Sequence, residues 1–566
     1  MRIALGQINP IIGDLKGNCD LILDACLKAA KENANLLVTP ELSLWGYPPK
    51  DLLLNPVLIN EQWAILDTIV ASIASKTPDL TLIVGIAETI EDAKFPPLFN
   101  SIVLINQKGW EVIARKQLLP TYDVFDEKRY FRSTNKSNHI TIQEGKKSWN
   151  IGLTICEDLW VEEEIQDKRV EGTDPITQLE TVNVDFLVNL SASPFAHQKY
   201  SLRHNIAAKA AKRLKCPVVY VNQVGANDEL VFDGGSFVVD SEGKILIALP
   251  HCQESIAIWE TGSQQIAPLF IDDPKKVLLD ALVLGVRDYA KKCGFSSALI
   301  GLSGGIDSAL VAVIATAALG KKNVSAILMP SPWSSSDSVT DANSLVKRLG
   351  INSEIIPIES LMTSYDLSLK TTLKGLPHGL TAENLQARIR GTLLMAIANQ
   401  NNHLLLATGN KSELAVGYCT LYGDMNGGLA VIGDLYKTSV FKLCDWIDSP
   451  AANRWKEFYQ LPNNKELIGL SIRQKQPSAE LRPGQLDIDS LPEYEKLDPI
   501  LKGLIEKKRS LIELVNQGHE PNLIKRIQKL LKKSEFKRRQ APPMLKVSNQ
   551  AFGSGWRIPI AATYSE

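Results

Sequence analysis

Short apolar runs recur along the first 250 residues, and each is bounded by Gly, Pro, Asn or Asp. They are rich in β-branched residues, which is typical of buried strands. Between them, residues 21–32 and 201–215 carry apolar side chains at helical spacing. This alternation predicts a mixed α/β layer architecture. The expected strands span residues 3–8, 36–38, 80–86, 101–105, 111–114, 151–155, 186–190, 218–221 and 237–239.

The pattern loosens over residues 251–274, which include Gln264 and Pro268. Beyond them, a strand at 297–302, a helix at 309–319, a strand at 324–329 and a helix at 339–349 form a βαβ series. Such a series predicts a doubly wound parallel sheet with helices on both faces. We therefore expect a first domain at 1–250, a linker at 251–275 and a second domain at 276–566 whose last part is helical and basic.

Length and charge limit the kind of protein. The 566 residues exceed one ordinary core, and 62 basic against 63 acidic residues give a net charge of −1. That balance provides no general attraction to nucleic acid or to an anionic membrane. The sequence shows no apolar run of about eighteen residues and no secretory signal. Eight cysteines without a CxxC spacing favour reduced, mostly buried thiols. We expect a cytoplasmic protein that binds neither nucleic acid nor membrane.

A glycine-rich turn follows the expected strand at 297–302. Small residues let the backbone curl tightly, so that its N–H groups and the next helix N-terminus can hold phosphate oxygens. Asp307 would repel a bare phosphate, which indicates a bridging Mg²⁺. The loop lacks the Gly-Lys-Ser/Thr end of a Walker loop and the third glycine of a dinucleotide fingerprint, which argues against both. The alternative is a helix start whose glycines serve only close packing. The loop comprises Gly301, Leu302, Ser303, Gly304, Gly305, Ile306, Asp307 and Ser308.

This loop resembles the PP-loop of the ATP pyrophosphatase family. Further motifs stand at residues 383–390, 408–413, 417–424, 434–438 and 477–481. Each alone could be a helix cap or surface charge, but in this order they resemble the NAD⁺ synthetase family from about Val277 to the C-terminus. Gln476 departs from the family pattern, in which a proline is expected.

The resemblance implies ATP-dependent amidation of deamido-NAD⁺ through an acyl-adenylate, with release of AMP and pyrophosphate. It implies that residues 301–308 and Thr408 bind ATP and that Asp307 and Glu413 lie near Mg²⁺. It also assigns Asn384, Glu413 and Lys537 to deamido-NAD⁺. Lys537 belongs to a basic stretch, residues 525–539, that is otherwise typical of a solvated amphipathic helix.

Three reactive side chains of the first domain stand at expected strand ends. Cys156 follows the strand at 151–155, Glu41 comes just past the strand at 36–38, and Lys116 comes just past the strand at 111–114. A thiol on a sharp strand-to-helix turn is exposed to a substrate, and a helix N-terminus there would favour the thiolate. The three could converge on one sheet edge. The alternative is three unrelated surface or cap residues.

This constellation resembles the nitrilase superfamily over about residues 1–250, which implies an αββα sandwich. The resemblance makes Glu41 the general base, Cys156 the nucleophile and Lys116 the cation that stabilises the tetrahedral intermediate. Glu127 is implied to orient the lysine. In the glutamine-using members, the matching positions Tyr122, Ser193 and Lys199 hold glutamine.

Together, the resemblances imply that the first domain releases ammonia from glutamine and that the second uses it to amidate deamido-NAD⁺. We expect an internal tunnel for the ammonia and a homo-oligomer; the substrates are glutamine, ATP and deamido-NAD⁺, with Mg²⁺. Two alternatives remain: an RNA-modifying PP-loop enzyme, and a nitrilase-type amidase with a nucleotide-sensing second domain. The missing paired cysteines and nucleic-acid module argue against the first. Asp307, Thr408 and Glu413, all present in context, argue against the second.

Overall fold

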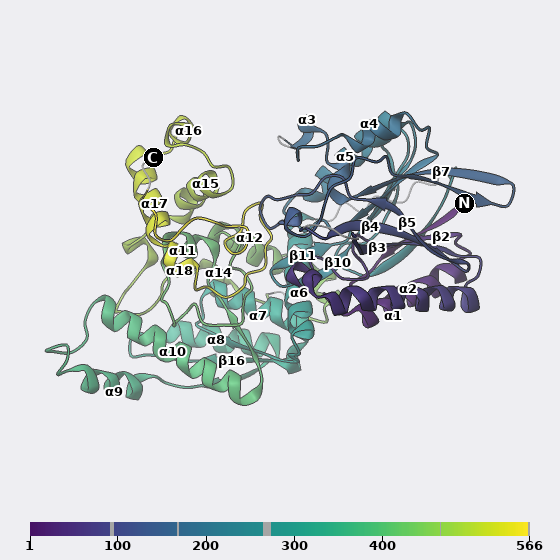
Figure 1. Cartoon of the computed structure of the whole chain (residues 1–566). Helices are drawn as coiled ribbons and strands as arrows, with labels where there is room; N and C mark the ends of the chain where they lie inside the picture. Colours follow the sequence, from purple (N-terminus) through teal and green to yellow (C-terminus); the bar gives the residue numbers. More distant parts are fainter. Residues whose placement is uncertain (91–94, 167–168, 264–272, 464–465, 564–566) are drawn as a thin grey trace. The chain divides into compact units, whose positions relative to one another are not determined.

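The computed structural model describes residues 1–90, 95–166, 169–263, 273–463 and 466–563 (Figure 1). The chain divides into two compact units, Met1–Val277 and Leu278–Glu566. The segment expected as a linker contains β14 (Ser255–Glu260), which pairs antiparallel with β1 (Arg2–Gln7). This pairing satisfies the otherwise open edge of β1, so these residues form part of the first sheet. Gln264 and Pro268 lie outside the described residues.

The first unit contains two six-stranded sheets, ordered β14-β1-β2-β3-β4-β5 and β13-β12-β9-β8-β7-β6. Their strands are β1 (Arg2–Gln7), β2 (Leu36–Val38), β3 (Thr81–Thr89), β4 (Leu98–Asn106), β5 (Gly109–Arg115), β6 (His139–Glu144), β7 (Lys147–Ile155), β8 (Phe186–Ser191), β9 (Val218–Asn222), β12 (Phe237–Val239), β13 (Ile245–Ala248) and β14. A separate hairpin pairs β10 (Val224–Asn227) with β11 (Leu230–Asp233). The helices are α1 (Leu15–Lys31), α2 (Pro56–Lys76), α3 (Glu163–Gln166), α4 (Pro175–Glu180) and α5 (Lys199–Leu214).

Strand alternation builds the layers of this unit. Ile3 and Leu5 of the first sheet share one buried cluster with Phe186 and Val188 of the second, so these side chains fill the space between the sheets. Ala4, between them in sequence, instead joins the cluster that contains α1 and α2, which run alongside each other (Figure 1). Helices α4 and α5 pack on the outer face of the second sheet. The expected αββα sandwich is confirmed.

One helix of the first unit has the composition of a membrane span. Within the described residues, α2 alone is long and apolar enough to cross a membrane by those two criteria. Leu66, Ile69 and Ile73 on this helix are fully buried in the cluster beneath the first sheet. Packing in the core therefore accounts for its apolar side.

The second unit is built on one five-stranded sheet, ordered β17-β16-β15-β18-β19, in which every pairing is parallel. Leu299 of the central strand packs with helix α10, while Ala298 and Ile300 on the other face are equally buried. A sheet covered on both faces is the expected doubly wound arrangement, which is confirmed. The strands are β15 (Ala298–Gly301), β16 (Val324–Leu328), β17 (Asn352–Ile355), β18 (Leu404–Ala407) and β19 (Leu429–Ala430).

Helices make up most of the rest of this unit. Those between residues 494 and 533 pack with α11 in one apolar cluster that includes Leu414, Leu497 and Ile527. The helices are α6 (Pro274–Lys292), α7 (Ile306–Leu319), α8 (Ser336–Leu349), α9 (Glu359–Leu369), α10 (Leu380–Asn401), α11 (Lys411–Val416), α12 (Lys437–Ile447), α13 (Asn453–Phe458), α14 (Leu470–Gln474), α15 (Tyr494–Ile505), α16 (Leu511–Asn516), α17 (Pro521–Lys533) and α18 (Glu535–Arg538).

Candidate functional site

Glu41 and Lys116 meet inside the first unit. Lys116 follows β5, and its ammonium donates to Glu41 Oε1 over 2.6 Å with neither side chain exposed. A buried ion pair is retained only where further hydrogen bonds offset the loss of water. Asn100 Nδ2 supplies one to Glu41 Oε1 at 2.7 Å, and the Ala192 N–H supplies another to Oε2 at 3.1 Å. These contacts fix the direction of the Glu41 carboxylate.

Cys156 stands on the turn that follows β7. Its backbone has a φ of 45°, in the left-handed region, and one turn of 3-10 helix (Cys156–Leu159) follows. Burial raises the pKa of the Cys156 thiol; the Glu41 charge adds to the rise and the Lys116 charge opposes it. Burial and the nearby carboxylates thus oppose the thiolate that the helix start is expected to favour. A neutral thiol needs a base to become a nucleophile.

Glu127 lies on the other side of Lys116. Its Oε1 accepts from Lys116 Nζ at 2.7 Å and from the Tyr47 hydroxyl at 2.7 Å. Burial would lower the pKa of Lys116, but the Glu127 and Glu41 carboxylates raise it well above its usual value. Lys116 is thus held as a cation between two carboxylates.

Asp158 joins the Cys156 turn to the segment after Lys116. Its Oδ1 accepts from the Gln117 N–H at 2.9 Å and the Leu118 N–H at 2.7 Å, and its Oδ2 accepts from the Ile155 N–H at 3.1 Å. The side chain is fully buried. One carboxylate therefore ties the ends of β5 and β7 together, strands that belong to different sheets.

The residues expected to hold glutamine lie at the ends of neighbouring elements. Ser193 follows β8 and is buried, while Lys199 begins α5. Tyr122 is about half exposed at 49%, and its hydroxyl donates to Glu157 at 2.9 Å. Burial raises the pKa of Glu157 to about 7, with Lys116 and Tyr122 opposing the rise. The residue after the nucleophile thus offers an acidic group beside the thiol.

In the second unit, the glycine-rich loop joins β15 to α7. Gly304 has a φ of +81°, and a Cβ there would stand 2.2 Å from the Ser338 carbonyl oxygen, so only glycine fits. Ser303 Oγ lies 3.2 Å from Ser308 Oγ and accepts from the Gly305 N–H at 3.2 Å. Helix α7 has no side-chain cap. Its first-turn N–H groups remain for an anion.

Asp307 and Glu413 lie on either side of one lysine. Lys437 Nζ contacts Asp307 Oδ2 and lies 3.1 Å from Glu413 Oε1, and its side chain is 3% exposed. Burial and the Asp307 charge raise the pKa of Glu413, with Lys437 opposing. Asn410 donates to Asp307 Oδ1 at 3.0 Å and caps α11, which carries Glu413. Both carboxylates are therefore within reach of one cation.

The remaining expected residues of this unit are placed as follows. Thr408 follows β18, whose Leu406 pairs with Ile300 of β15, so Thr408 lies beside the glycine-rich loop. Asn384, on α10, accepts from the Thr420 hydroxyl at 2.8 Å. Lys537 donates to the carbonyl oxygens of Gly417 and Cys419 at 2.8 and 2.7 Å. In this structure its ammonium supports the loop after α11.

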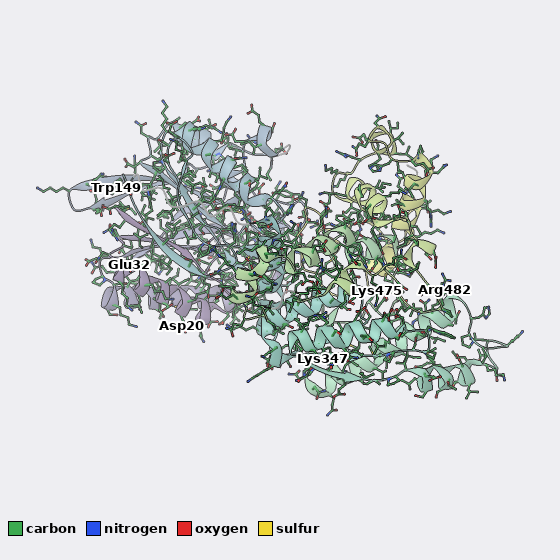
Figure 2. All side chains as sticks on the ribbon, turned by 180° about the vertical axis from the view of Figure 1, so that it is seen from behind. Asp20, Glu32, Trp149, Lys347, Lys475 and Arg482 are labelled. Atoms are coloured by element: carbon green, nitrogen blue, oxygen red, sulfur yellow. The ribbon has the colours of Figure 1, made fainter. Side chains whose placement is uncertain are left out.

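The segment after α14 packs against α8, beside the glycine-rich loop. Lys475, labelled in Figure 2, pairs with Asp341 at 2.7 Å and donates to Ser338 Oγ at 3.0 Å. Glu480 accepts from the same Ser338 hydroxyl at 2.6 Å. Because the Ser338 carbonyl touches Gly304, this segment and the glycine-rich loop share one support.

Comparison with known proteins accounts for both units. Residues 2–269 match the carbon-nitrogen hydrolase family and residues 278–541 match the NAD synthase family. The chain is 50% identical over 573 residues to the glutamine-dependent NAD(+) synthetase of Synechocystis sp. (strain ATCC 27184 / PCC 6803 / Kazusa), covering 99% of each chain. It is 38% identical over 605 residues to that of Thermotoga maritima, covering 100% of this chain and 99% of the relative. This chain belongs to the glutamine-dependent NAD⁺ synthetase family.

Solved structures agree with that membership. A glutamine-dependent NAD⁺ synthetase from Acinetobacter baumannii, solved with ADP, is 34% identical and superposes with a TM-score of 0.74 over 99% of this chain and 98% of that one. A family member from Cytophaga hutchinsonii, 20% identical, has the same fold, with a TM-score of 0.79 over 100% and 98%. The fold of this family is thus shared over the full chain.

Within this family member, several site residues were not predicted from the sequence. Glu157 and Asp158 adjoin Cys156, so proximity to the nucleophile was a usable signal. Lys437 stands in the motif at 434–438, whose pattern assigns no role to any single residue. Asn100 carried no signal, because only the pairing of β4 with β5 brings it to Lys116.

Proposed function

We propose that this chain makes NAD⁺ from deamido-NAD⁺, with ATP as energy source and with ammonia released from glutamine in the first unit. The observation that carries the proposal is that one chain contains two sets of side chains, one in each unit, whose chemistry fits the two halves of the reaction. Cys156, Glu41 and Lys116 provide a nucleophile, a base and a cation in the first unit. The glycine-rich loop with Asp307 and Glu413 provides a phosphate-binding edge in the second.

In the first unit, Glu41 takes the proton of the Cys156 thiol as sulfur attacks the amide carbon of glutamine. The negative charge that develops on the amide oxygen is stabilised by Lys116, which stays protonated because two carboxylates raise its pKa. Glu41 returns the proton to the leaving nitrogen, and ammonia departs. Water, deprotonated by Glu41, then cleaves the thioester to give glutamate and the free thiol.

Tyr122, Ser193 and Lys199 hold glutamine in this proposal. Lys199 provides a positive charge and Ser193 a hydroxyl for the α-carboxylate. Glu157, buried next to Cys156 and bonded to Tyr122, provides a negative charge for the α-ammonium. A substrate with both charges is thereby distinguished from a simple amide.

In the second unit, the nicotinate carboxylate of deamido-NAD⁺ attacks the α-phosphorus of ATP and displaces pyrophosphate. Ammonia then adds to the acyl carbon of the acyl-adenylate, and AMP leaves with the former carboxylate oxygen. The first-turn N–H groups of α7 and the hydroxyls of Ser303 and Ser308 bind phosphate oxygens. Thr408 completes the ATP site, while Asn384, Glu413 and Lys537 bind deamido-NAD⁺.

The residues around Asp307 fit a magnesium ion that arrives with ATP. Asp307 and Glu413 are hard oxygen donors that already share one cation, the Lys437 ammonium. Within the described part of the chain, no group of three or more His, Cys, Asp or Glu side chains could hold a metal ion by itself. Mg²⁺ is commonly bound by one or two carboxylates together with substrate phosphates. When bound, it would neutralise charge developing on the phosphates.

Ammonia must reach the acyl-adenylate as the neutral molecule. Because free ammonia in neutral water is mostly ammonium, which is not a nucleophile, we propose that it travels through an internal tunnel.

We also propose a homo-oligomer, on the ground that the basic stretch around Lys537 supplies cations suited to a substrate of a neighbouring copy. Eight cysteines without a CxxC spacing, six of them buried, fit a reducing cytoplasm.

The Cys156→Ala variant tests the proposal. Supplied with ATP, deamido-NAD⁺ and glutamine as nitrogen source, this variant should make no NAD⁺. Release of AMP and pyrophosphate is measured in the same reaction. With abundant ammonium chloride, NAD⁺ synthesis should match the unmodified chain. Cys216→Ala removes another buried thiol of the same unit and should leave both reactions intact. Loss of the ammonia-supported reaction in a folded Cys156→Ala protein, or AMP release that depends on RNA, would contradict the proposal.

A further inference from the structure

A buried arginine lies directly behind the residues proposed to bind glutamine. Arg203 is on α5, one turn after Lys199, and is 1% exposed. Its guanidinium donates through Nη2 to the carbonyl oxygens of Ser193 at 2.7 Å and Pro194 at 3.1 Å. Its Nε donates to Ser193 Oγ at 3.2 Å. Four residues apart on a helix, Lys199 and Arg203 share a face.

The charge of this arginine is balanced inside the protein. Arg203 Nη1 donates to Asp233 Oδ1 at 2.8 Å, and Asp233 Oδ2 lies 3.2 Å from His251 Nδ1. Burial would raise the pKa of Asp233, but Arg203 and His251 lower it to about 2. The Asp233 carboxylate, and the ion pair with it, therefore stays charged well below neutral pH. The forked guanidinium of arginine can donate hydrogen bonds to the Asp233 carboxylate and to the Ser193 turn at once, whereas a lysine ammonium cannot.

The backbone of the turn has a second, independent support. Asn222 Oδ1 accepts from the Ser193 N–H at 2.9 Å, and the neighbouring Ala192 N–H holds Glu41. Asn222 thus supports the side of the turn that faces the catalytic base. The Ser193 carbonyl is shared by Arg203 at 2.7 Å and Asn222 Nδ2 at 3.3 Å, and Arg203 also bonds the Ser193 hydroxyl.

Because Arg203 only donates, Ser193 Oγ accepts in their shared bond, and the hydroxyl proton of Ser193 is directed to a second partner. In this structure the Tyr220 hydroxyl is the neighbouring candidate, and in the proposed function the α-carboxylate of glutamine takes that place. We infer that Arg203 is a positioning residue for recognition of this carboxylate. It fixes Ser193 relative to Lys199, which lies on the same face of α5 as Arg203. The inference rests on the proposed glutaminase function and extends it to a residue that does not touch the substrate.

The role predicts a selective defect in Arg203→Lys. This variant keeps a buried cation beside Asp233 but loses the fork that holds the Ser193 turn. The KM for glutamine should rise about 10- to 100-fold, the ratio that corresponds to losing one hydrogen bond to a charged group. The kcat of glutamine hydrolysis should change less than about threefold, because Asn222 still holds the part of the turn next to Glu41.

Two alkylating agents distinguish a loss of glutamine positioning from general damage around Cys156. 6-Diazo-5-oxo-L-norleucine carries the α-carboxylate and α-ammonium of glutamine, whereas iodoacetamide carries neither. In Arg203→Lys, inactivation through Cys156 by the first should slow about 10- to 100-fold, and alkylation by the second should stay within about threefold. Equal slowing of both reactions, or no slowing of either, would overturn the inference.

The control is His251→Asn, which alters the other contact of Asp233 and leaves the bonds of Arg203 to the turn in place. Both alkylation rates and the KM for glutamine should stay within about threefold of the parent. If Arg203→Lys does not accumulate as folded protein, Arg203→Met combined with Asp233→Asn removes both charges together and should show the same selective slowing. If the parent chain itself neither hydrolyses glutamine nor reacts with the diazo compound, the proposed function fails, whatever the variants do.

Discussion

Replacing Asp158 by Asn tests how the Cys156 turn is joined to the segment that carries Lys116. The asparagine oxygen can still accept from the Gln117 and Leu118 N–H groups, but its NH₂ group would face the Ile155 N–H, now 3.1 Å from a carboxylate oxygen. Two donors then face each other in a fully buried position. A lost bond to a charged group together with an unsatisfied buried N–H costs about 3 kcal/mol.

This loss should be measurable in both stability and activity. For a unit of this size, 3 kcal/mol corresponds to a fall of about 6 °C in the thermal midpoint, followed by calorimetry. Because small displacements of reacting groups are costly, the kcat for glutamine-supported synthesis should fall about 10- to 100-fold. Ammonia-supported synthesis in the second unit should stay unchanged.

The control is Asp14→Asn, which also replaces an aspartate that accepts from a backbone N–H, that of Gly17 at 2.9 Å. Asn serves as well as Asp at a helix N-cap, so the midpoint should move by less than about 2 °C and glutamine turnover should be unaffected. A midpoint and a kcat for Asp158→Asn that match those of Asp14→Asn would refute the reasoning.

Three further expectations concern other parts of the chain. Burial raises the pKa of Glu157 to about 7, so protonation should lower kcat/KM for glutamine about tenfold per pH unit below 7, and Glu157→Gln should remove that slope; an unchanged profile would exclude the residue. Chelation of divalent cations should stop pyrophosphate release, for which Asp307 and Glu413 are proposed, and leave glutamine hydrolysis intact; persistent pyrophosphate release would contradict the proposal. Asp434→Asn removes the 2.8 Å carboxylate partner of the buried Lys411 ammonium and leaves it only Glu506 at 3.5 Å among the carboxylates that the described residues bring to it, so it should destabilise the second unit by about 3 kcal/mol in denaturant unfolding, while unfolding of the first unit stays the same.

Local patterns in the sequence were sufficient for the mixed α/β class of the first unit and for the parallel sheet of the second, whereas the αββα layering was implied by the family resemblance. The apolar runs at 36–38 and 186–190 and the glycine-rich turn at 301–308 depend on neighbouring residues alone, so strand ends and the loop could be assigned without tertiary information. Their reactive side chains followed, because chemistry at a strand end leaves a local signal. The edge strand β14 left no such signal, since its partner β1 lies more than 240 residues away.

The sequence by itself predicted most of the strands and the glycine-rich loop, because each is a short-range pattern of residue types, and the family resemblance made Cys156 the proposed nucleophile. Only the tertiary structure decided the protonation and the supports of these groups. Burial raises the pKa of Cys156, Lys437 stands between Asp307 and Glu413, and Arg203 reaches the Ser193 turn from a helix. Desolvation and charge pairing depend on which distant segments pack together, and no local pattern specifies that.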